Sequence, residues 1–318
     1  MRTSKKNNIS LSDTFVILGA GITLILSLIS LTAGPEESAA GYVRKGRVKE
    51  KILKVSYIYV GQGDATLVRD VRPGGKSMLI DGGAFFKDKS GSVFNAGQTY
   101  IAPYFEEEGI KKVDYIVATH KDADHIGGLA YIVDNVEVER VFSNSTPNIT
   151  ENYEILIAAA KRKGIMVEEL KAGDTISFSK DIVCQVIGPL RNYAGGRDSE
   201  NDSSLVIRIV AGKSVFVFSG DMEIPAEMDM LSYGDDIRCT FFKAPHHGSH
   251  SSSSKPFLDL IRPQVVVFSC GKNNEFGFPV IEVLRRYEDI HSDILRTDLH
   301  GTIEIVTDGK KYKIYKKE

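Results

Sequence analysis

Two imidazoles and two carboxylates fall within residues 120–125 of this 318-residue chain. Alternate side chains of an extended segment point the same way, so His120, Asp122 and Asp124 would share one side. A turn at Asp124 would bring His125 round to join them. Imidazole nitrogen and carboxylate oxygen are together a ligand set for zinc, manganese or iron. The segment is therefore a candidate metal site, and the competing interpretation is a solvated polar turn.

The elements on either side predict where this segment lies. Residues 113–118 form an apolar run typical of a buried strand, and residues 127–133 begin with two glycines and continue as a helix start. The segment is thus expected on a strand-to-helix loop, where open sheets usually place binding sites. Similar patterns predict further strands at 51–60, 65–69, 76–80, 138–143, 205–210, 214–219, 237–243 and 265–269, and helices at 101–108, 153–163, 223–231 and 280–287.

The pattern His-x-Asp-x-Asp-His-x-Gly-Gly at 120–128 resembles the His-x-His-x-Asp-His metal motif of the metallo-β-lactamase superfamily. It departs at Asp122, where most members have histidine, and that departure is typical of the ComEC-like branch of competence proteins. The resemblance implies an α/β fold in which two mixed β-sheets form an αβ/βα four-layer sandwich, from about residue 54 onward. Further segments that agree with this branch follow in order at 60–65, 79–83, 201–206, 218–221 and 246–249.

The resemblance implies one or two divalent metal ions, zinc or manganese, with Asp221 bridging the two sites. No histidine occurs between 125 and 246, so Asp202, or the carbonyl of Asn201, would replace a histidine that many relatives have. Spacing does not decide which of the two adjacent histidines binds metal. The full set of expected ligands is His120, Asp122, Asp124, His125, Asp202, Asp221, His246 and His247.

Asp124 and His247 are the expected catalytic residues. Four further residues are expected to support the ligands: Asp64, Asp81, Ser249 and His300. By the resemblance Asp81 would hold the ligands from behind, with a plain turn residue as the alternative, and Asp64 would either face the site or cap its own turn. His300 would approach from the C-terminal end. At Phe278 the family usually has histidine, so any role of that histidine is lost here.

The predicted function is metal-dependent hydrolysis by a metal-activated water, with a phosphodiester, DNA being one candidate, as substrate. A carboxylate at Asp122 makes the site harder and more anionic, which favours manganese and suits anionic phosphodiesters. The formal net charge of −2 gives no global basic field for nucleic acid. The alternatives are a cell-wall polymer esterase of the phosphorylcholine esterase type and a non-catalytic, metal-stabilised surface module. No protein partner is implied.

The N-terminal part predicts export. Residues 1–13 form a basic tail, and residues 14–34 are uncharged and long enough to span a bilayer as a helix. Basic residues before this stretch and Glu36 and Glu37 after it place the N-terminus in the cytoplasm by the positive-inside rule. Residues 35–50 would be a linker and 51–318 an extracellular hydrolase domain on a single-pass anchor. A cleavable signal peptide, which would release the domain, is the alternative.

If residues 14–34 are a retained anchor, the full-length protein should pellet with membranes, because an uncharged helix of this length partitions into the bilayer. Protease added to intact cells should digest the domain. Recovery of an untouched domain in the cytosolic fraction would contradict export, and recovery in the medium would favour the cleaved signal.

Overall fold

The computed structural model of the protein describes residues 44–48, 50–87, 89–193 and 199–317, all within the unit Ala40–Glu318. The expected anchor at 14–34 and most of the expected linker lie outside these residues. Within the described ranges, no helix combines the length and the apolar character needed to cross a bilayer.

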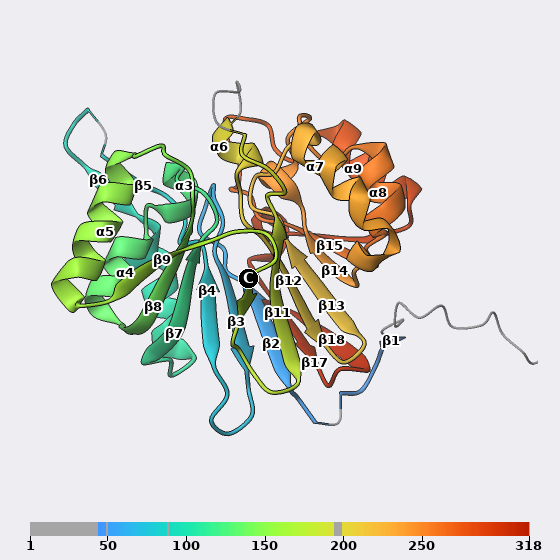
Figure 1. Cartoon of the computed structure of the whole chain (residues 1–318), viewed down its shortest axis with the longest axis horizontal. Coiled ribbons are helices and arrows are strands. Elements are labelled where there is room, and N and C mark those ends of the chain that lie inside the picture. Colours follow the sequence, from blue (N-terminus) through green and yellow to red (C-terminus); the bar gives the residue numbers. More distant parts are fainter. Residues whose placement is uncertain (1–43, 49, 88, 194–198, 318) are drawn as a thin grey trace, which may run out of the picture. The chain divides into compact units, whose positions relative to one another are not determined.

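Two mixed β-sheets lie at the centre of the fold (Figure 1). The larger sheet has the order β1 (Arg44–Lys45), β18 (Lys311–Lys317), β17 (Thr302–Thr307), β2 (Leu53–Tyr57), β3 (Thr66–Asp70), β4 (Ser77–Ile80), β7 (Lys112–Ala118), β8 (Glu137–Asn144) and β9 (Met166–Leu170). The smaller sheet has the order β10 (Thr175–Ile176), β11 (Ile182–Gly188), β12 (Val206–Ala211), β13 (Ser214–Phe218), β14 (Phe241–Lys243), β15 (Val265–Phe268) and β16 (Asp293–Arg296).

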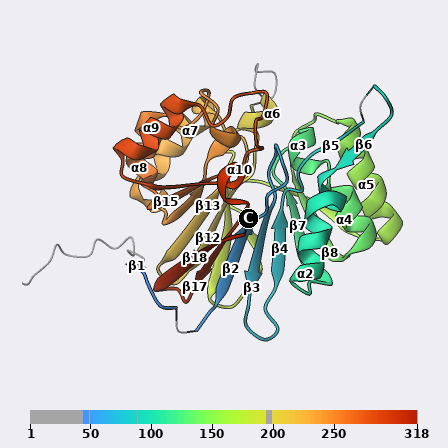
Figure 2. The ribbon, with the colours of Figure 1, turned by 180° about the vertical axis from the view of Figure 1, so that it is seen from behind.

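Helices cover the outer face of each sheet, as Figure 2 shows from behind. The larger sheet carries α2 (Ala102–Glu107), α4 (Leu129–Asn135) and α5 (Glu151–Lys163), and the smaller carries α7 (Ile224–Met230), α8 (Lys255–Ile261) and α9 (Ile281–Asp289). The short elements are the hairpin β5 (Phe85–Lys87) and β6 (Val93–Asn95), the helices α3 (Ala123–Ile126), α6 (Ser199–Asp202) and α10 (Thr297–His300), a π-helical turn (Gly97–Ile101), and 3₁₀ turns (Leu231–Ile237, Pro245–Gly248). The expected four-layer arrangement of two mixed sheets is confirmed.

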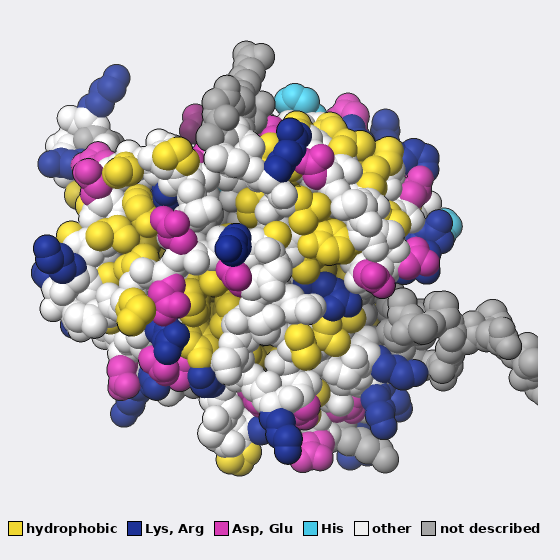
Figure 3. Space-filling view, viewed as in Figure 1, with side chains coloured by type: hydrophobic (Ala, Val, Ile, Leu, Met, Phe, Trp, Pro, Cys, Tyr) yellow, Lys and Arg dark blue, Asp and Glu magenta, His cyan; other side chains and the backbone are white. Residues whose placement is uncertain are grey.

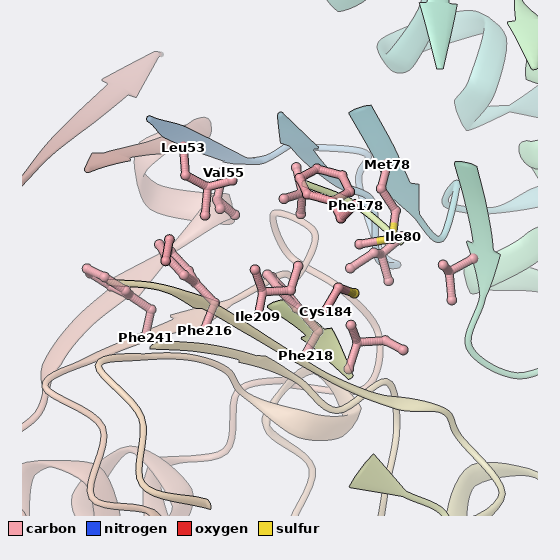
Figure 4. Close-up of a cluster of buried hydrophobic side chains, with 14 of the residues drawn as sticks. Leu53, Val55, Met78, Ile80, Phe178, Cys184, Ile209, Phe216, Phe218 and Phe241 are labelled. Carbon is pink, nitrogen blue, oxygen red and sulfur yellow. The ribbon is translucent and has the colours of Figure 1, made fainter. Parts of the chain in front are cut away.

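The main core lies between the two sheets. Leu53 and Val55 of β2 face Phe216 and Phe241 of the smaller sheet, and all four side chains are fully buried (Figure 4). Two further apolar cores join each sheet to its helices. Strands such as β4 are therefore buried on both faces, which explains why their sequences are continuous apolar runs rather than alternating ones.

Parallel strands position the loops that carry the polar cluster. In the larger sheet β4 and β7 run parallel with Ile80 opposite Val117, so Asp81 and Thr119 leave the sheet together. In the smaller sheet β13, β14 and β15 are also parallel, with Phe218 opposite Lys243. The segments that follow these strands consequently meet at one end of the sandwich.

Most predicted elements are present, with shifted ends. The helix expected at 153–163 begins earlier, at Glu151, because Thr150 caps it by accepting a hydrogen bond from the Tyr153 amide. The strand predicted at 237–243 is wrong in its first half, where a 3₁₀ turn continues to Ile237 and the strand starts only at Phe241. The β5–β6 hairpin and α8 were not anticipated.

Gly128, at the start of α4, has no room for a side chain. A Cβ there would lie 2.1 Å from the Gly82 carbonyl oxygen and 2.5 Å from the Gly97 amide nitrogen. Gly128→Ala should therefore lower the free energy of unfolding by about 3 kcal/mol, since two backbones must separate. Gly46→Ala is the control, because its Cβ would meet only Lys311 Cδ at 3.5 Å. Equal urea midpoints for the two variants, with chelator present, would contradict this packing.

Candidate metal centre

Asp81 organises the metal segment from behind. Its side chain is buried and its φ is +58°, a left-handed conformation that costs a non-glycine residue about 1 kcal/mol or more. The carboxylate accepts hydrogen bonds from the Thr119 amide (2.8 Å), the Thr119 hydroxyl (2.7 Å) and His125 Nδ1 (2.8 Å). Burial raises the pKa of Asp81, and His125 opposes that shift. The structure places Asp81 directly behind His120 and His125.

These bonds also decide which ring nitrogens face the site. The Thr119 hydroxyl donates to Asp81, so its oxygen accepts from His120 Nδ1 at 3.1 Å. His247 Nδ1 donates to the Ser269 carbonyl at 2.9 Å. With the proton on Nδ1, the Nε2 atoms of His120 and His125 are free ligand nitrogens, whereas His247 Nε2 lies at hydrogen-bond distance from Asp124.

The Nε2 atoms of these rings lie close to the carboxylates of Asp221 and Asp124. His125 Nε2 lies 3.1 Å from Asp221 Oδ1, and His247 Nε2 lies 3.2 Å from Asp124 Oδ2 and 3.5 Å from Asp221 Oδ2. Among the described residues, four groups of three bring their ligand atoms within 4.8 Å of one another. The groups are His120, His125 and Asp221; Asp124, His125 and His247; Asp64, Asp81 and His125; and Asp64, Asp221 and His247.

The donor set fits a divalent cation. The Nε2 atoms of His120 and His125 and one oxygen each of Asp64 and Asp221 are buried, with no hydrogen-bond partner among the described residues. An unsatisfied buried polar atom costs about 1–3 kcal/mol, and more if it is charged. Four such atoms in one place are explained if they are metal ligands, since imidazole and carboxylate are what zinc and manganese bind.

Burial and charge shift the pKa values of the cluster in opposite directions. Burial lowers the pKa of His120 to about 3, and the neighbouring charge on His125 adds to the shift. Burial alone would lower the pKa of His247, but the carboxylates of Asp221 and Asp64 raise it to about 10. Burial opposes ionisation of Asp221, yet His125 and His247 hold its pKa well below the usual range. At neutral pH the Asp221 carboxylate therefore stays ionised.

Asp122 lies at the open edge of the cluster. Its carboxylate is 46% exposed, and Oδ2 is 3.7 Å from His120 Nε2. Two ligands of one cation are about 3–4 Å apart when each bond is about 2.1 Å, so the pair could share an ion. Burial raises the pKa of Asp122 to about 6; His125 opposes this shift, and the carboxylates of Asp124 and Asp221 add to it.

The side chains of the two adjacent histidines point to different places because both residues have positive φ. His246 has a φ of +49° and His247 a φ of +53°, so the backbone turns sharply between them. His247 points inward and is buried, and it belongs to two of the four groups. His246 belongs to none of those formed by the described residues. Its Nδ1 donates to Glu223 at 2.9 Å, and its Nε2 is 3.8 Å from Asp221 Oδ2.

Asp202 is not placed as a metal ligand. Its Oδ1 accepts hydrogen bonds from the amides of Glu223 (3.1 Å) and Ala226 (3.2 Å), which open α7, and it joins none of the four groups. The structure does not bring Asp202 into these groups, where it was expected to replace the missing histidine. Anionic capping of a helix start, with its unpaired amides, explains the buried carboxylate instead.

The other supporting residues also take defined places. Asp64 faces the site, since its carboxylate lies 3.3 Å from His247 Nδ1 and 2.8 Å from Lys243 Nζ. Ser249 bonds Ser251 (2.9 Å), whose hydroxyl donates to Glu223. The structure does not bring His300 into the cluster: its Nδ1 accepts from the Arg296 amide at 3.1 Å within its own turn, and it joins none of the four groups.

Two site residues were missed in the sequence. Lys243 is the buried last residue of β14, which is otherwise apolar. Its ammonium group pairs with Asp64 and donates to the Ala244 carbonyl. Glu223 holds His246 and Ser251. For Lys243 the available signal was a lysine in the otherwise apolar run before the two histidines. For Glu223 the sequence offered no signal.

The comparisons with known proteins agree with this geometry. Residues 58–143 match the model of the metallo-beta-lactamase superfamily. The chain is similar to part of the ComE operon protein 3 of Bacillus subtilis (30% identity over 79% of this chain and 32% of that protein). It is also similar to part of the competence protein ComA of Neisseria gonorrhoeae (28% identity over 83% of this chain and 34% of that protein). The ComEC-like resemblance is thus confirmed.

The chain spans about a third of the length of these curated relatives. Among solved structures, CmlA, a diiron β-hydroxylase from Streptomyces venezuelae, matches with a TM-score of 0.50 and 13% identity, over 85% of this chain and 55% of that one. At this identity the match supports the fold alone.

Asp221→Ala should remove a carboxylate that two of the four groups share, so metal content after reconstitution should fall. Asp202→Ala should keep its metal, because it lies outside the groups, and lose about 1 kcal/mol of stability from the uncapped helix. Metal analysis and urea unfolding of both variants check this. Full and equal metal content in both variants would show that Asp221 is not a shared metal ligand.

Proposed function

We propose that the domain is a metal-dependent hydrolase that cleaves phosphodiesters. The observation that carries the proposal is the pair of overlapping groups that share Asp221, one with His120 and His125 and the other with Asp64 and His247. A shared carboxylate between two groups of buried donors suits two adjacent cations. Such cations would lower the pKa of a water and neutralise charge on a phosphoryl oxygen.

The side chains around that centre supply orientation. Asp124 is held by His247 at 3.2 Å and keeps about a third of its side chain exposed, so it can face both the centre and an entering ligand. Burial opposes its ionisation, but the hydrogen bond from His247 lowers its pKa below the usual range. Asp124 is therefore an ionised carboxylate that can accept a hydrogen bond from the attacking water.

His246 is placed to act on the leaving group. Burial would lower its pKa, but the hydrogen bond to Glu223 and the charge of Asp221 raise it overall. The ring is 23% exposed, with Nε2 toward the centre and Nδ1 committed to Glu223. A protonated Nε2 at this position can donate a proton to the leaving alkoxide of a diester.

A phosphodiester fits the charges better than a neutral ester does. The carboxylate of Asp122 adds negative charge where most of the superfamily has imidazole, which favours hard cations and an anionic substrate that they neutralise. Charged side chains of both signs are interspersed on the face seen in Figure 3, so DNA would be bound by local contacts at the site. One curated relative is named as a competence protein, and on this ground we include DNA among the candidate substrates.

The decisive measurement is metal analysis of the purified domain together with hydrolysis of bis(p-nitrophenyl) phosphate, single-stranded DNA and nitrocefin. Metal-dependent cleavage of the first two supports the proposal. Cleavage of phosphorylcholine esters alone would favour the cell-wall esterase. Bound metal without turnover of any ester would favour the surface module.

We further propose that residues 14–34 export the domain, either as a retained single-pass anchor or as a cleaved signal. The uncharged stretch and the flanking charges support this orientation. An extracellular domain would meet phosphodiesters that come from outside the cell.

Asp124→Ala should lower turnover of bis(p-nitrophenyl) phosphate by about a hundredfold or more, because the carboxylate that orients the water is lost. Asp134→Ala is the control, since Asp134 lies on the neighbouring helix and only pairs with Arg162 at the surface. Initial rates with saturating manganese check this. The same rate for wild type and Asp124→Ala on every ester would remove the enzyme interpretation.

Asp122→His would restore the commoner superfamily residue. It replaces an anionic oxygen with a softer nitrogen, so zinc should activate the variant better relative to manganese than it activates the wild type. The fold should persist because the side chain is half exposed. Activity titrations with each metal check this, and an unchanged zinc-to-manganese ratio would exclude Asp122 from the centre.

A further inference from the structure

Two stacked phenylalanines stand at the rim of the candidate centre. Phe276 is 58% exposed, and its ring stacks on Phe278 with centroids 5.5 Å apart and planes 20° from parallel. Phe86 is the other large exposed phenylalanine among the described residues. An exposed aromatic side chain gives up the stabilisation that burial would bring, and such surfaces often bind ligands.

The loop that carries the pair is fixed by its own hydrogen bonds. The Asn274 side chain accepts from the Phe278 amide at 3.0 Å, donates to the Phe278 carbonyl at 2.7 Å and donates to the Gly271 carbonyl at 3.0 Å. The rings are therefore held in place before any ligand arrives, which reduces the entropy lost on binding.

The same loop packs against the turn that carries the two histidines. The edge of Phe278 meets the His246 ring at a centroid distance of 5.7 Å and an angle of 71°. The Val280 amide donates to the Gly248 carbonyl at 3.0 Å. His246 Nε2 is in turn 3.8 Å from Asp221. The aromatic pair therefore adjoins the group proposed to act on the leaving alkoxide.

We propose that Phe276 and Phe278 form a stacking platform for the nucleobase next to the phosphodiester that is cut. The inference rests on the proposed function, and it narrows the substrate class to single-stranded nucleic acid. Bases of a single strand expose their faces, whereas those of a duplex are already stacked. Lys272 on the same loop is exposed and can contact the strand's backbone.

The shape of the pair favours a base over a quaternary ammonium group. Binding of choline relies on several aromatic faces that enclose the cation. Two nearly parallel rings, one more than half exposed, offer one flat face, which matches a planar base. One ring of the pair, Phe278, occupies a position at which the superfamily usually has histidine. The aromatic surface is therefore a departure of this sequence from the superfamily pattern.

The test compares two substrates that differ only in their bases: a short oligothymidylate and an abasic oligomer of equal length. Phe276→Ala should raise KM for the oligothymidylate about tenfold and leave KM for the abasic oligomer unchanged. Phe276→Trp should retain wild-type KM, because indole also stacks. Phe86→Ala is the matched control, since it removes the other exposed ring, and it should behave as wild type. Binding of fluorescent oligothymidylate in an Asp124→Ala background, measured by anisotropy, should show the same dependence on Phe276.

The outcomes separate the two proposals. If wild type cuts the abasic oligomer but Phe276→Ala binds and cuts oligothymidylate normally, the platform is refuted and the proposed function stands. An effect of Phe86→Ala in place of Phe276→Ala refutes it as well, as does Phe276-dependent binding of phosphocholine but not of oligothymidylate. If wild type cuts neither oligomer, the proposed function fails, while Phe276-dependent anisotropy would still support a base-binding surface.

Discussion

The hydrogen bonds accepted by Asp81 are the contacts on which the candidate centre depends. One carboxylate fixes the Thr119 backbone, the Thr119 hydroxyl and the His125 ring, and through that hydroxyl it also orients His120. The side chain is buried, where an unpaired anion would cost several kcal/mol. Donors from three groups offset that cost, and in return two imidazoles are held with Nε2 free. The arrangement exists only because β4 and β7 are parallel neighbours that end together.

A second requirement is compensation of the negative charge on the buried carboxylates of Asp64 and Asp221. Within the described chain, the groups that pair with one or both of them are Lys243, His125, His246 and His247. These groups leave several oxygens and nitrogens without hydrogen bonds. The protein thus stabilises the ligands in place while leaving unsatisfied the atoms that a cation would engage.

The sequence predicted what is local and missed what depends on distant partners. The segment 120–125, its flanking strand and helix, and the layered fold follow from short patterns and from the family resemblance. The choice between His246 and His247 could not be predicted, because it depends on two consecutive residues with positive φ. The hydrogen bonds of Asp202 could not be predicted, since their partner, the start of α7, is brought close only by tertiary packing. The role of Lys243 could not be predicted from its apolar strand, because its counter-ion, Asp64, lies in the loop before β3 of the other sheet.

The Leu205 amide donates to the Thr119 carbonyl at 2.9 Å, joining the start of β12 in one sheet to the metal segment of the other. His125 and Asp221 meet across the same boundary. The candidate centre therefore lies on the seam between two halves of the domain, and a bound ion would act as a cross-link between them. Metal occupancy of the centre would then be coupled to the packing of one half of the domain on the other. Chelation would reduce the cooperativity of the whole domain rather than loosen a single loop.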